Sequence, residues 1–193
     1  MRSFRKLNAT ISHKIKWNQK ERNGFEQQIF LKKYRAGDVL ADENEICDRL
    51  FFINKGILCN ISKIENPSPI VTRFAFENHL ITDFVSFNTG RPSMSAIQAL
   101  EDTECVVIPR SAVEWFYNNV GEGEKLGRII FERFYYLLCK ISRLQYVKAP
   151  AERYKLMTEL FPEVESRVSQ RYRSFFLKID PAYFTRLNLA GRA

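Results

Sequence analysis

The sequence contains no uncharged apolar run near the roughly 18 residues that a membrane-spanning helix needs, although the chain has 193 residues. Its first residues, Met1-Arg-Ser-Phe-Arg-Lys6, lead straight into charged positions, without the apolar stretch and cleavage site of a signal peptide. We therefore expect a cytoplasmic protein that does not associate with a membrane.

Metal-binding residues are also scarce. The chain has two histidines, His13 and His79, and four widely spaced cysteines that form no Cys-x-x-Cys pair. Zinc and iron–sulfur sites need closer ligand pairs, and a cupin-type metal oxidase needs clustered histidines. These absences predict reduced thiols, no metal centre and no enzymatic activity.

What the chain does have is apolar and basic. Hydrophobic residues make up 45% of the sequence and aromatic residues 13%, enough to bury a core. The net charge of +8 is unevenly placed: residues 1–35 carry +8, residues 36–150 carry −3, and residues 151–193 carry +3. Two basic ends can face a polyanion such as nucleic acid, or they can be solvated surface, and charge alone leaves both interpretations open.

The first half of the chain combines a helical segment with a β-rich one. Apolar residues at spacings of three and four, from Phe4 to Ile15, predict that the chain is helical throughout residues 1–35. Residues 38–108 carry short apolar runs between turn signals, such as Leu50-Phe-Phe-Ile53. Several short strands at near-regular spacing predict an antiparallel barrel or sandwich.

Residues 111–147 return to helical periodicity. Ser111 is expected to cap a short helix, with Glu114 three residues later. A long helix follows over residues 124–147, and its apolar residues have the 4-3-4-3 spacing of a coiled-coil seam. We interpret this row as a homodimer interface rather than as packing within one chain, which the same spacing also allows. The row consists of Ile130, Phe134, Leu137, Ile141 and Leu144.

The segment 149–193 is too short for a robust core of its own. Its start is marked by Pro150, since proline suits the first turn of a helix. Helices are expected over residues 151–160 and 170–177, and a third begins at Pro181 after a turn capped by Asp180. Two short helices around a three-residue turn predict a helix-turn-helix domain over residues 149–193, after a sensor domain over residues 1–148.

The order of these elements resembles that of the Crp/Fnr transcriptional regulators over nearly the whole chain. The cues in the β-rich segment are Gly37-Asp38-Val39-Leu40, Leu50-Phe51-Phe52-Ile53 with Gly56, and Ala99-Leu100-Glu101-Asp102-Thr103-Glu104. The segments most similar to the Bacteroidetes branch are Asp83 to Ser93, Glu152-Arg153-Tyr154, Ser169 to Tyr172, and Ile179-Asp180-Pro181. The resemblance implies an α+β fold: N-terminal helices, an antiparallel β-roll of the cyclic-nucleotide-binding type, a long dimerisation helix and a C-terminal helix-turn-helix.

In the cyclic-nucleotide binders of this family, a Gly-Glu pair holds the ribose and an Arg-Ser/Thr-Ala run holds the phosphate. The matching positions here are Thr82 and Asp83, and then Ser93, Met94 and Ser95. Losing the charged partner of a buried phosphate costs on the order of 3–5 kcal/mol. Arg91 is a candidate substitute, but a capped turn at Asp83 and a solvated Arg91 are favoured. We therefore expect no tight binding of cyclic AMP, and an effector that is nucleotide-like or another small molecule.

The resemblance also implies a surface that reads DNA. The candidates for contacts with base edges are Pro181, Ala182, Tyr183 and Arg186, at the start of the recognition helix. Arg186 matches the family's arginine and can bind guanine, whereas Ala182 stands where the family often has glutamate. The expected phosphate contacts are Ser169, Gln170, Arg171 and Lys178.

Two departures from the family concern stability. Lys178 lies in the turn where the family favours glycine, and a left-handed backbone there would cost roughly 1 kcal/mol. Arg173 occupies a position that is usually apolar, and its charged head is expected to reach water or phosphate.

These inferences predict a homodimeric regulator that binds double-stranded DNA, with RNA polymerase as a further partner. A signal received by the β-roll would change the spacing of two recognition helices. The alternative is a sensor-like interaction protein that kept the scaffold and lost DNA reading, which the altered pocket, Ala182 and Lys178 favour. Salt dependence separates the two, because contacts with DNA phosphates weaken steeply as salt rises.

Overall fold

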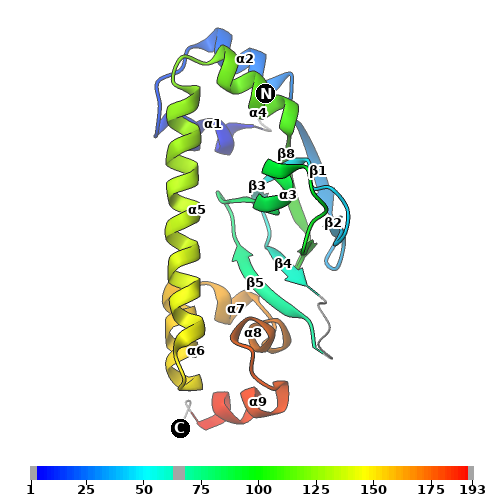
Figure 1. Cartoon of the computed structure of the whole chain (residues 1–193), viewed down its shortest axis with the longest axis vertical. Coiled ribbons are helices and arrows are strands. Elements are labelled where there is room, and N and C mark those ends of the chain that lie inside the picture. The colour runs from blue at the N-terminus through cyan, green and yellow to red at the C-terminus, as the bar shows by residue number, and fades with distance from the viewer. Residues whose placement is uncertain (1–3, 63–67, 191–193) are drawn as a thin grey trace.

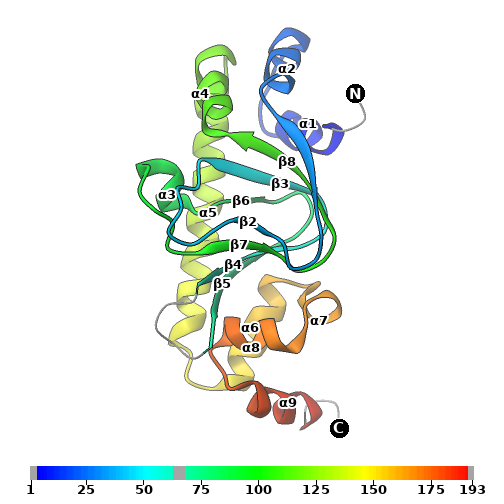
Figure 2. The ribbon, with the colours of Figure 1, turned by 90° about the vertical axis from the view of Figure 1, so that its right-hand side faces the viewer.

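The computed structural model describes residues 4–62 and 68–190, with side chains described as far as Thr185. Two four-stranded antiparallel sheets form a β-roll in the upper and middle part of the molecule (Figures 1 and 2). In spatial order, the first sheet contains β1 (Phe30–Tyr34), β8 (Thr103–Pro109), β3 (Arg49–Lys55) and β6 (Leu80–Ile81). The second contains β2 (Val39–Ala41), β7 (Ala96–Ala99), β4 (Leu58–Ser62) and β5 (Ile70–Ala75).

The apolar runs that predicted strands supply the core between the two sheets. Alternate side chains of a strand point to opposite faces, so Phe51, Leu58 and Ile97 meet inside the roll with no exposed surface. Gly56 joins β3 to β4 with a φ of +102°. A Cβ at Gly56 would lie 2.3 Å from Oγ1 of Thr103, so only glycine fits this turn. The prediction of an antiparallel β-roll is confirmed.

The N-terminal helices are α1 (Arg5–Ser12) and α2 (Gln19–Glu26). The stripe predicted from Phe4 onward buries Leu7 and Ile11, and Asn18 caps α2. The prediction of helix throughout residues 1–35 is wrong at its end, where the chain forms β1. Phe30 lies opposite Val107 in this pairing, and the short local pattern of β1 carries no sign of a partner so distant in sequence.

Three helices connect the roll to the C-terminal segment: α3 (Phe84–Thr89), α4 (Arg110–Asn119) and α5 (Gly123–Tyr146). Ser111 does not cap α4, because the helix already begins at Arg110 and Pro109 takes the cap position. The long helix α5 agrees with its predicted range to within one residue at each end, and it runs along one side of the molecule (Figure 1). Within residues 4–62 and 68–190, no helix is long and apolar enough to cross a membrane.

The last four helices are α6 (Pro150–Leu160), α7 (Val164–Arg167), α8 (Gln170–Leu177) and α9 (Pro181–Ala190), and they lie below β4 and β5 (Figure 2). The rings of Phe161 and Phe176 pack on Phe74 of β5, with centroids 5.7 and 5.2 Å away. One apolar cluster includes residues of β4, β5, α5 and these helices. The C-terminal segment therefore packs against β4 and β5 in a cluster separate from the core between the sheets, as its short length predicts.

Candidate effector and nucleic-acid sites

Two of the predicted effector residues of the β-roll, Met94 and Ser95, meet at the carboxylate of a third, Asp83. Asp83 precedes α3, and its Oδ1 accepts a hydrogen bond from the backbone N–H of Ser86 at 3.0 Å. Its Oδ2 accepts two further bonds of 3.2 Å, one from the backbone N–H of Met94 and one from the hydroxyl of Ser95. A buried carboxylate thus links the start of α3 to the segment that precedes β7.

The neighbouring hydroxyls have partners of their own. Thr82 donates to the carbonyl of Arg49 at 2.9 Å, and Ser93 donates to the carbonyl of Ser95 at 2.9 Å. Both residues are buried, whereas the side chain of Arg91 is exposed. The predicted capped turn at Asp83 is confirmed, and Arg91 lies at the surface.

This network opposes a cyclic phosphate in the β-roll. The N–H of Met94 and the hydroxyl of Ser95 are the groups that the Crp/Fnr resemblance assigns to phosphate binding, and both already donate to Asp83. A phosphate would have to displace that carboxylate or lie beside it, and two like charges in a buried site repel strongly. The geometry therefore favours an effector site elsewhere.

The turn between α8 and α9 has the predicted form. Lys178 adopts the left-handed conformation, with φ 52° and ψ 48°, although it is not glycine. Asp180 caps the next helix, because its Oδ1 accepts a hydrogen bond from the backbone N–H of Tyr183 at 2.9 Å. Helix α8 therefore ends at the predicted turn, and α9 begins where Asp180 and Pro181 predict.

The outer surface of this helix pair carries the residues predicted to contact DNA. Exposed side chains there are Ser169, Gln170, Arg171, Lys178, Pro181, Ala182 and Tyr183. The side chain of Arg186 lies outside the part that the structure describes. Sequence reasoning missed Thr185, which is exposed on α9 with its hydroxyl 3.5 Å from the amide oxygen of Gln170. The three-residue spacing from Ala182 to Thr185 was the available signal, since it places both on one helix face.

The expectation for Arg173 is wrong. Its side chain is buried, its Nη1 lies 3.3 Å from the hydroxyl of Tyr154, and its guanidinium packs over the ring of Phe184. The charged head is buried among the C-terminal helices instead of lying at the surface. Burial among α6, α8 and α9 makes Arg173 a link within the C-terminal helices.

The row of α5 that was assigned to a homodimer faces the chain's own body. Ile141 and Leu144 are buried in the cluster shared with the C-terminal helices, and Leu137 packs against the same cluster. Ile130 packs against the cluster of the N-terminal helices, and the ring of Phe134 lies 5.5 Å from that of Phe84 in α3. For these five residues the alternative, packing within one chain, holds.

A second apolar row on α5 faces outward. Phe131, Tyr135 and Leu138 follow one another at spacings of four and three residues, and 51–61% of their surface is exposed. The rings of Phe131 and Tyr135 stack at 6.5 Å, and Phe84 extends the patch onto α3. A contiguous exposed apolar patch of this kind is typical of an interaction surface.

The C-terminal helices are also fixed to the β-roll by charge. Arg167 of α7 forms two parallel 2.8 Å hydrogen bonds with Glu77, which follows β5. It also contacts Glu101, before β8, and Glu163, the residue before α7, both at 2.6 Å. The hydrogen bonds from Arg167 hold the pKa of Glu77 down to about 2. This half-buried group joins the tip of the roll to the helices below it.

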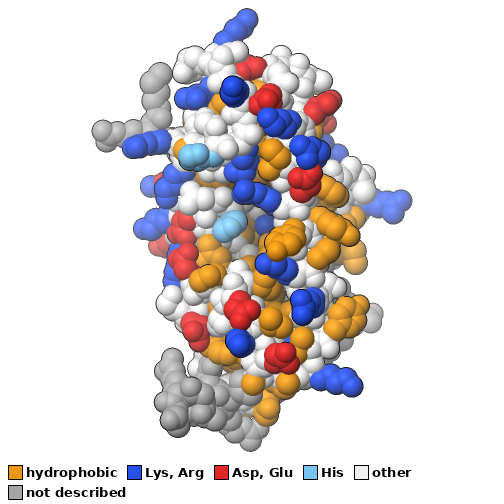
Figure 3. Space-filling view, turned by 90° about the vertical axis from the view of Figure 1, so that its left-hand side faces the viewer, with side chains coloured by type: hydrophobic (Ala, Val, Ile, Leu, Met, Phe, Trp, Pro, Cys, Tyr) orange, Lys and Arg blue, Asp and Glu red, His pale blue; other side chains and the backbone are white. Residues whose placement is uncertain are grey.

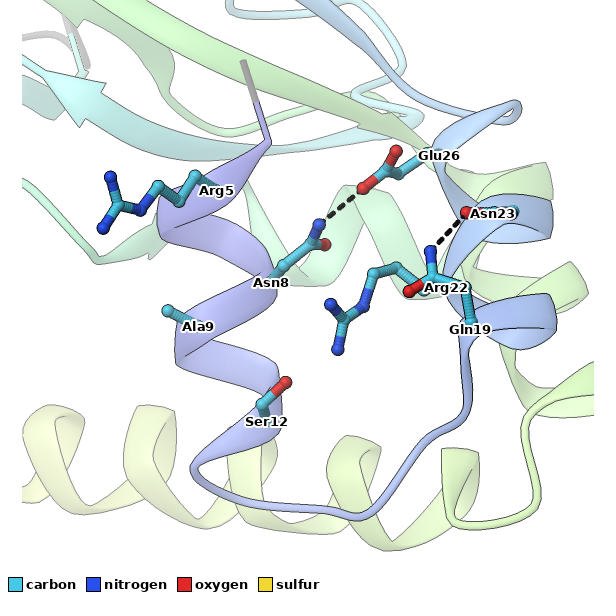
Figure 4. Close-up of a pocket in the computed structure, with 8 residues that line it drawn as sticks. All are labelled: Arg5, Asn8, Ala9, Ser12, Gln19, Arg22, Asn23 and Glu26. Atoms are coloured by element: carbon cyan, nitrogen blue, oxygen red, sulfur yellow. Dashed lines mark hydrogen bonds between the residues drawn. The ribbon is translucent and has the colours of Figure 1, made fainter. Parts of the chain in front are cut away.

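The basic N-terminal segment lies at the other end of the molecule. Figure 1 places α1 and α2 at the opposite end from α9, so the two basic ends do not form one surface of a single chain. A polar hollow of about 370 Å³ separates α1 from α2, and Asn8 points across it to donate to Glu26 (Figure 4). We find no sign of ligand chemistry there, since the contacts across it join the two helices to each other.

Comparisons with known proteins agree with this geometry. Residues 31–119 match the model of the cyclic nucleotide-binding domain family. FixK2 from Bradyrhizobium japonicum is 14% identical over 82% of this chain and 81% of its own, with a TM-score of 0.69. The chain has the fold of the Crp/Fnr regulators. Its similarity extends to the c-di-GMP-responsive regulator CLP of Xanthomonas campestris, with 14% identity, 90% and 93% coverage and a TM-score of 0.69.

A transcriptional regulator assigned to the Crp/Fnr family from Eubacterium rectale is 12% identical, with a TM-score of 0.68 over 88% of this chain and 81% of that one. No curated protein matches the sequence. At these identities the solved structures establish the fold, and the function has to be argued from the residues of this chain.

Proposed function

We propose that this protein is a homodimeric transcriptional regulator of the Crp/Fnr type, which uses α9 to read double-stranded DNA. The observation that carries the proposal is the exposed start of α9 beside the basic side chains of Arg171 and Lys178. A helix with exposed N-terminal residues and flanking cations is suited to the major groove between two phosphate backbones. Contact with RNA polymerase belongs to the same proposal.

The outer row of α5 supports a dimer. Two copies paired through Phe131, Tyr135 and Leu138 would bury aromatic and aliphatic surface that one chain leaves exposed. Because α5 ends close to the C-terminal helices, pairing along it would bring two α9 helices to one side of the dimer (Figure 1). This row replaces the inward-facing residues as the proposed interface.

The proposed mechanism is a change in the relative position of the two α9 helices. A signal that alters the angle at which two α5 helices pair would favour either a good or a poor half-site spacing, without chemistry on a substrate. The Asp83 network makes cyclic AMP in the β-roll an unsuitable signal. An effector that contacts α5 directly would act on the pairing angle.

The experiment is selection of binding sites from a random duplex library, with purified wild-type protein and the Arg186→Ala variant. Wild type should enrich a palindrome with half-sites about 34–36 Å apart. The variant should lose about 1–3 kcal/mol of discrimination at one base pair in each half-site. Arg192→Ala, at the basic end of the same segment, is the matched control and should enrich the same palindrome as wild type.

Salt dependence then separates the regulator from the interaction protein. Affinity for the selected duplex should fall by several orders of magnitude between low and moderate salt if several cations contact phosphates. No enriched sequence, together with weak binding that ignores sequence, would overturn DNA reading. It would favour the scaffold protein that has lost this activity.

A further inference from the structure

A cavity of about 470 Å³ lies between α5, the outer face of the first sheet and the N-terminal helices. Its volume falls within the range of about 300–1,000 Å³ that is usual for small-molecule sites. None of the β-roll effector candidates lines it. The lining is mainly apolar and comes from helices and from strands of both sheets, and it includes Leu7, Leu50, Phe52, Ile108, Phe116 and Ile130.

Cationic side chains gather at this otherwise apolar cavity. Lys14 of the N-terminal segment, Arg73 of β5 and Arg133 of α5 all line it. Within residues 4–62 and 68–185, none of the three forms an ion pair with a carboxylate. Figure 3 shows blue and pale-blue side chains beside orange hydrophobic ones on the α5 side of the molecule. Three cations without a carboxylate partner make the cavity electrostatically suited to an anion.

The electrostatics of the cluster point the same way. Burial first, and then the charge of Arg133, lower the pKa of Lys14. Burial also lowers the pKa of His79, another lining residue, and the charges of Arg73 and Arg133 lower it further. The charge of Glu163 raises the pKa of His79 and offsets part of this repulsion, and an anion among the cations would relieve more of it.

Arg73 is the most deeply placed of the cations. Its Nη2 donates to the carbonyl of Leu80 at 2.8 Å, and its guanidinium lies 4.2 Å from the ring centroid of Phe134. Its Nε is buried and has no hydrogen-bond partner. Burial lowers the pKa of Arg73 to about 10, so the group remains charged at neutral pH. A buried donor without a partner is costly, which is a reason to expect an acceptor there in the functional state.

We propose that this cavity binds a single-chain lipid with an anionic head group, its aliphatic chain among the apolar lining residues and its head group near Lys14, Arg73 and Arg133. The inference goes beyond the proposed function and does not depend on it, because binding can be measured without DNA. A chain of methylene groups gains from burial in such a lining, and the head group supplies the missing negative charge.

The position of the cavity would put a bound lipid in contact with the exposed apolar row of α5. Phe131 and Phe134 of α5 line one side, and Phe52 and Leu80 of the first sheet line the other. Phe131 is also part of the exposed row that we propose as the dimer interface. A ligand in the cavity therefore contacts both the β-roll and the helix whose pairing angle would matter.

The experiment is isothermal titration calorimetry on the full-length protein with three probes below their aggregation concentrations. Dodecanoate and dodecyl phosphate carry anionic heads and distinguish a fatty acid from a phosphate lipid, while dodecanol has the same chain with a neutral head. We expect saturable binding of at least one anionic probe, one molecule per chain, and at least about tenfold weaker binding of dodecanol. Equal affinity for dodecanol, or no saturable binding of either anionic probe, would overturn the proposal.

Variants locate the site. The double variant Lys14→Met, Arg133→Met should bind the anionic probe at least about tenfold more weakly, while its affinity for dodecanol should not change. Arg143→Met is the matched control, since Arg143 is an exposed arginine of the same helix that does not line the cavity. Ile130→Trp should reduce binding of every probe by filling the cavity, with its fold checked by circular dichroism. Anionic binding that is unaffected by the double variant would place the lipid elsewhere and contradict the proposal.

Discussion

The helices that follow the β-roll have two faces with different roles. Their inner faces are closed: Leu144, Phe176 and Phe184 have at most 1% of their surface exposed, and Arg167 has three carboxylate partners. Their outer faces are exposed, with the apolar row of α5 and the basic side chains of Arg171 and Lys178 both at the surface. Inner faces therefore hold the fold together, and outer faces are the surfaces that we propose for association.

This difference bears on how the protein can respond to a signal. The C-terminal helices are joined to the β-roll both by an apolar cluster that includes β4 and β5 and by the contacts of Arg167. A signal would then act mainly between two chains, through the pairing of α5, rather than by releasing α8 and α9 from the roll.

The largest expected effect is on the inner face. Phe176→Ala should lower the free energy of unfolding by about 3–5 kcal/mol, because it leaves a cavity between the rings of Phe74 and Phe161. Urea unfolding at neutral pH measures the change. Tyr146→Ala removes an aromatic ring that is 83% exposed on α5 and should change stability by less than about 0.5 kcal/mol. Equal losses for the two variants would contradict the division between faces.

The second effect is on the outer row. Leu138→Glu should weaken binding to the selected duplex by about a hundredfold or more, because a single α9 loses the avidity of the pair. The melting temperature of the isolated chain should hold, since the side chain of Leu138 is 61% exposed. Fluorescence anisotropy with the labelled duplex gives the affinity. Unchanged binding by the variant would show that DNA reading does not need this row.

The third effect depends on pH. Arg167 lowers the pKa of Glu77 to about 2, below the ordinary value of 4.5. A lowered pKa contributes stability that is fully present above about pH 4.5 and is lost as pH falls toward 2. The free energy of unfolding of the wild type should therefore exceed that of Glu77→Gln by about 2 kcal/mol at pH 7, a value reduced for partial exposure of the group. This difference should become smaller as the pH falls. A constant difference between pH 7 and pH 3 would rule out this ionic link.

The smallest effect concerns the turn on the outer side. Lys178→Gly should raise the free energy of unfolding by up to about 1 kcal/mol, because glycine adopts the left-handed conformation of this turn without steric cost. The same change removes one predicted phosphate contact, so the slope of DNA affinity against salt should fall by about one. Thermal unfolding measures the change in stability, and a salt titration of DNA binding measures the change in slope. A stability gain without any change in the salt slope would remove Lys178 from the DNA surface.

Much of the fold could be predicted from local sequence patterns. Prolines and a capping residue predicted the starts of α6 and α9, since Pro150, Pro181 and Asp180 act on their immediate neighbours. Strand β1 was missed because its pairing with β8 joins distant segments. The seam on α5 was placed on the wrong face because heptad spacing identifies a row that packs without identifying its partner.

The sites were predictable only in part, for a similar reason. Exposed turn and helix residues such as Lys178 and Ala182 lie where the motif places them. The carboxylate of Asp83 meets Met94 and Ser95 across eleven and twelve residues of chain, which no spacing rule describes. The cation cluster of Lys14, Arg73 and Arg133 comes from three separate elements, and folding alone brings it together.

The most direct test of the two-faced account is sedimentation equilibrium on the purified wild-type protein beside Leu138→Glu. The chain has a mass of 22.7 kDa, and wild type should sediment as a dimer, whereas the variant should sediment as a folded monomer. A wild-type protein that stays monomeric at the concentrations where it binds DNA would contradict the account, because the outer row of α5 would then have no partner.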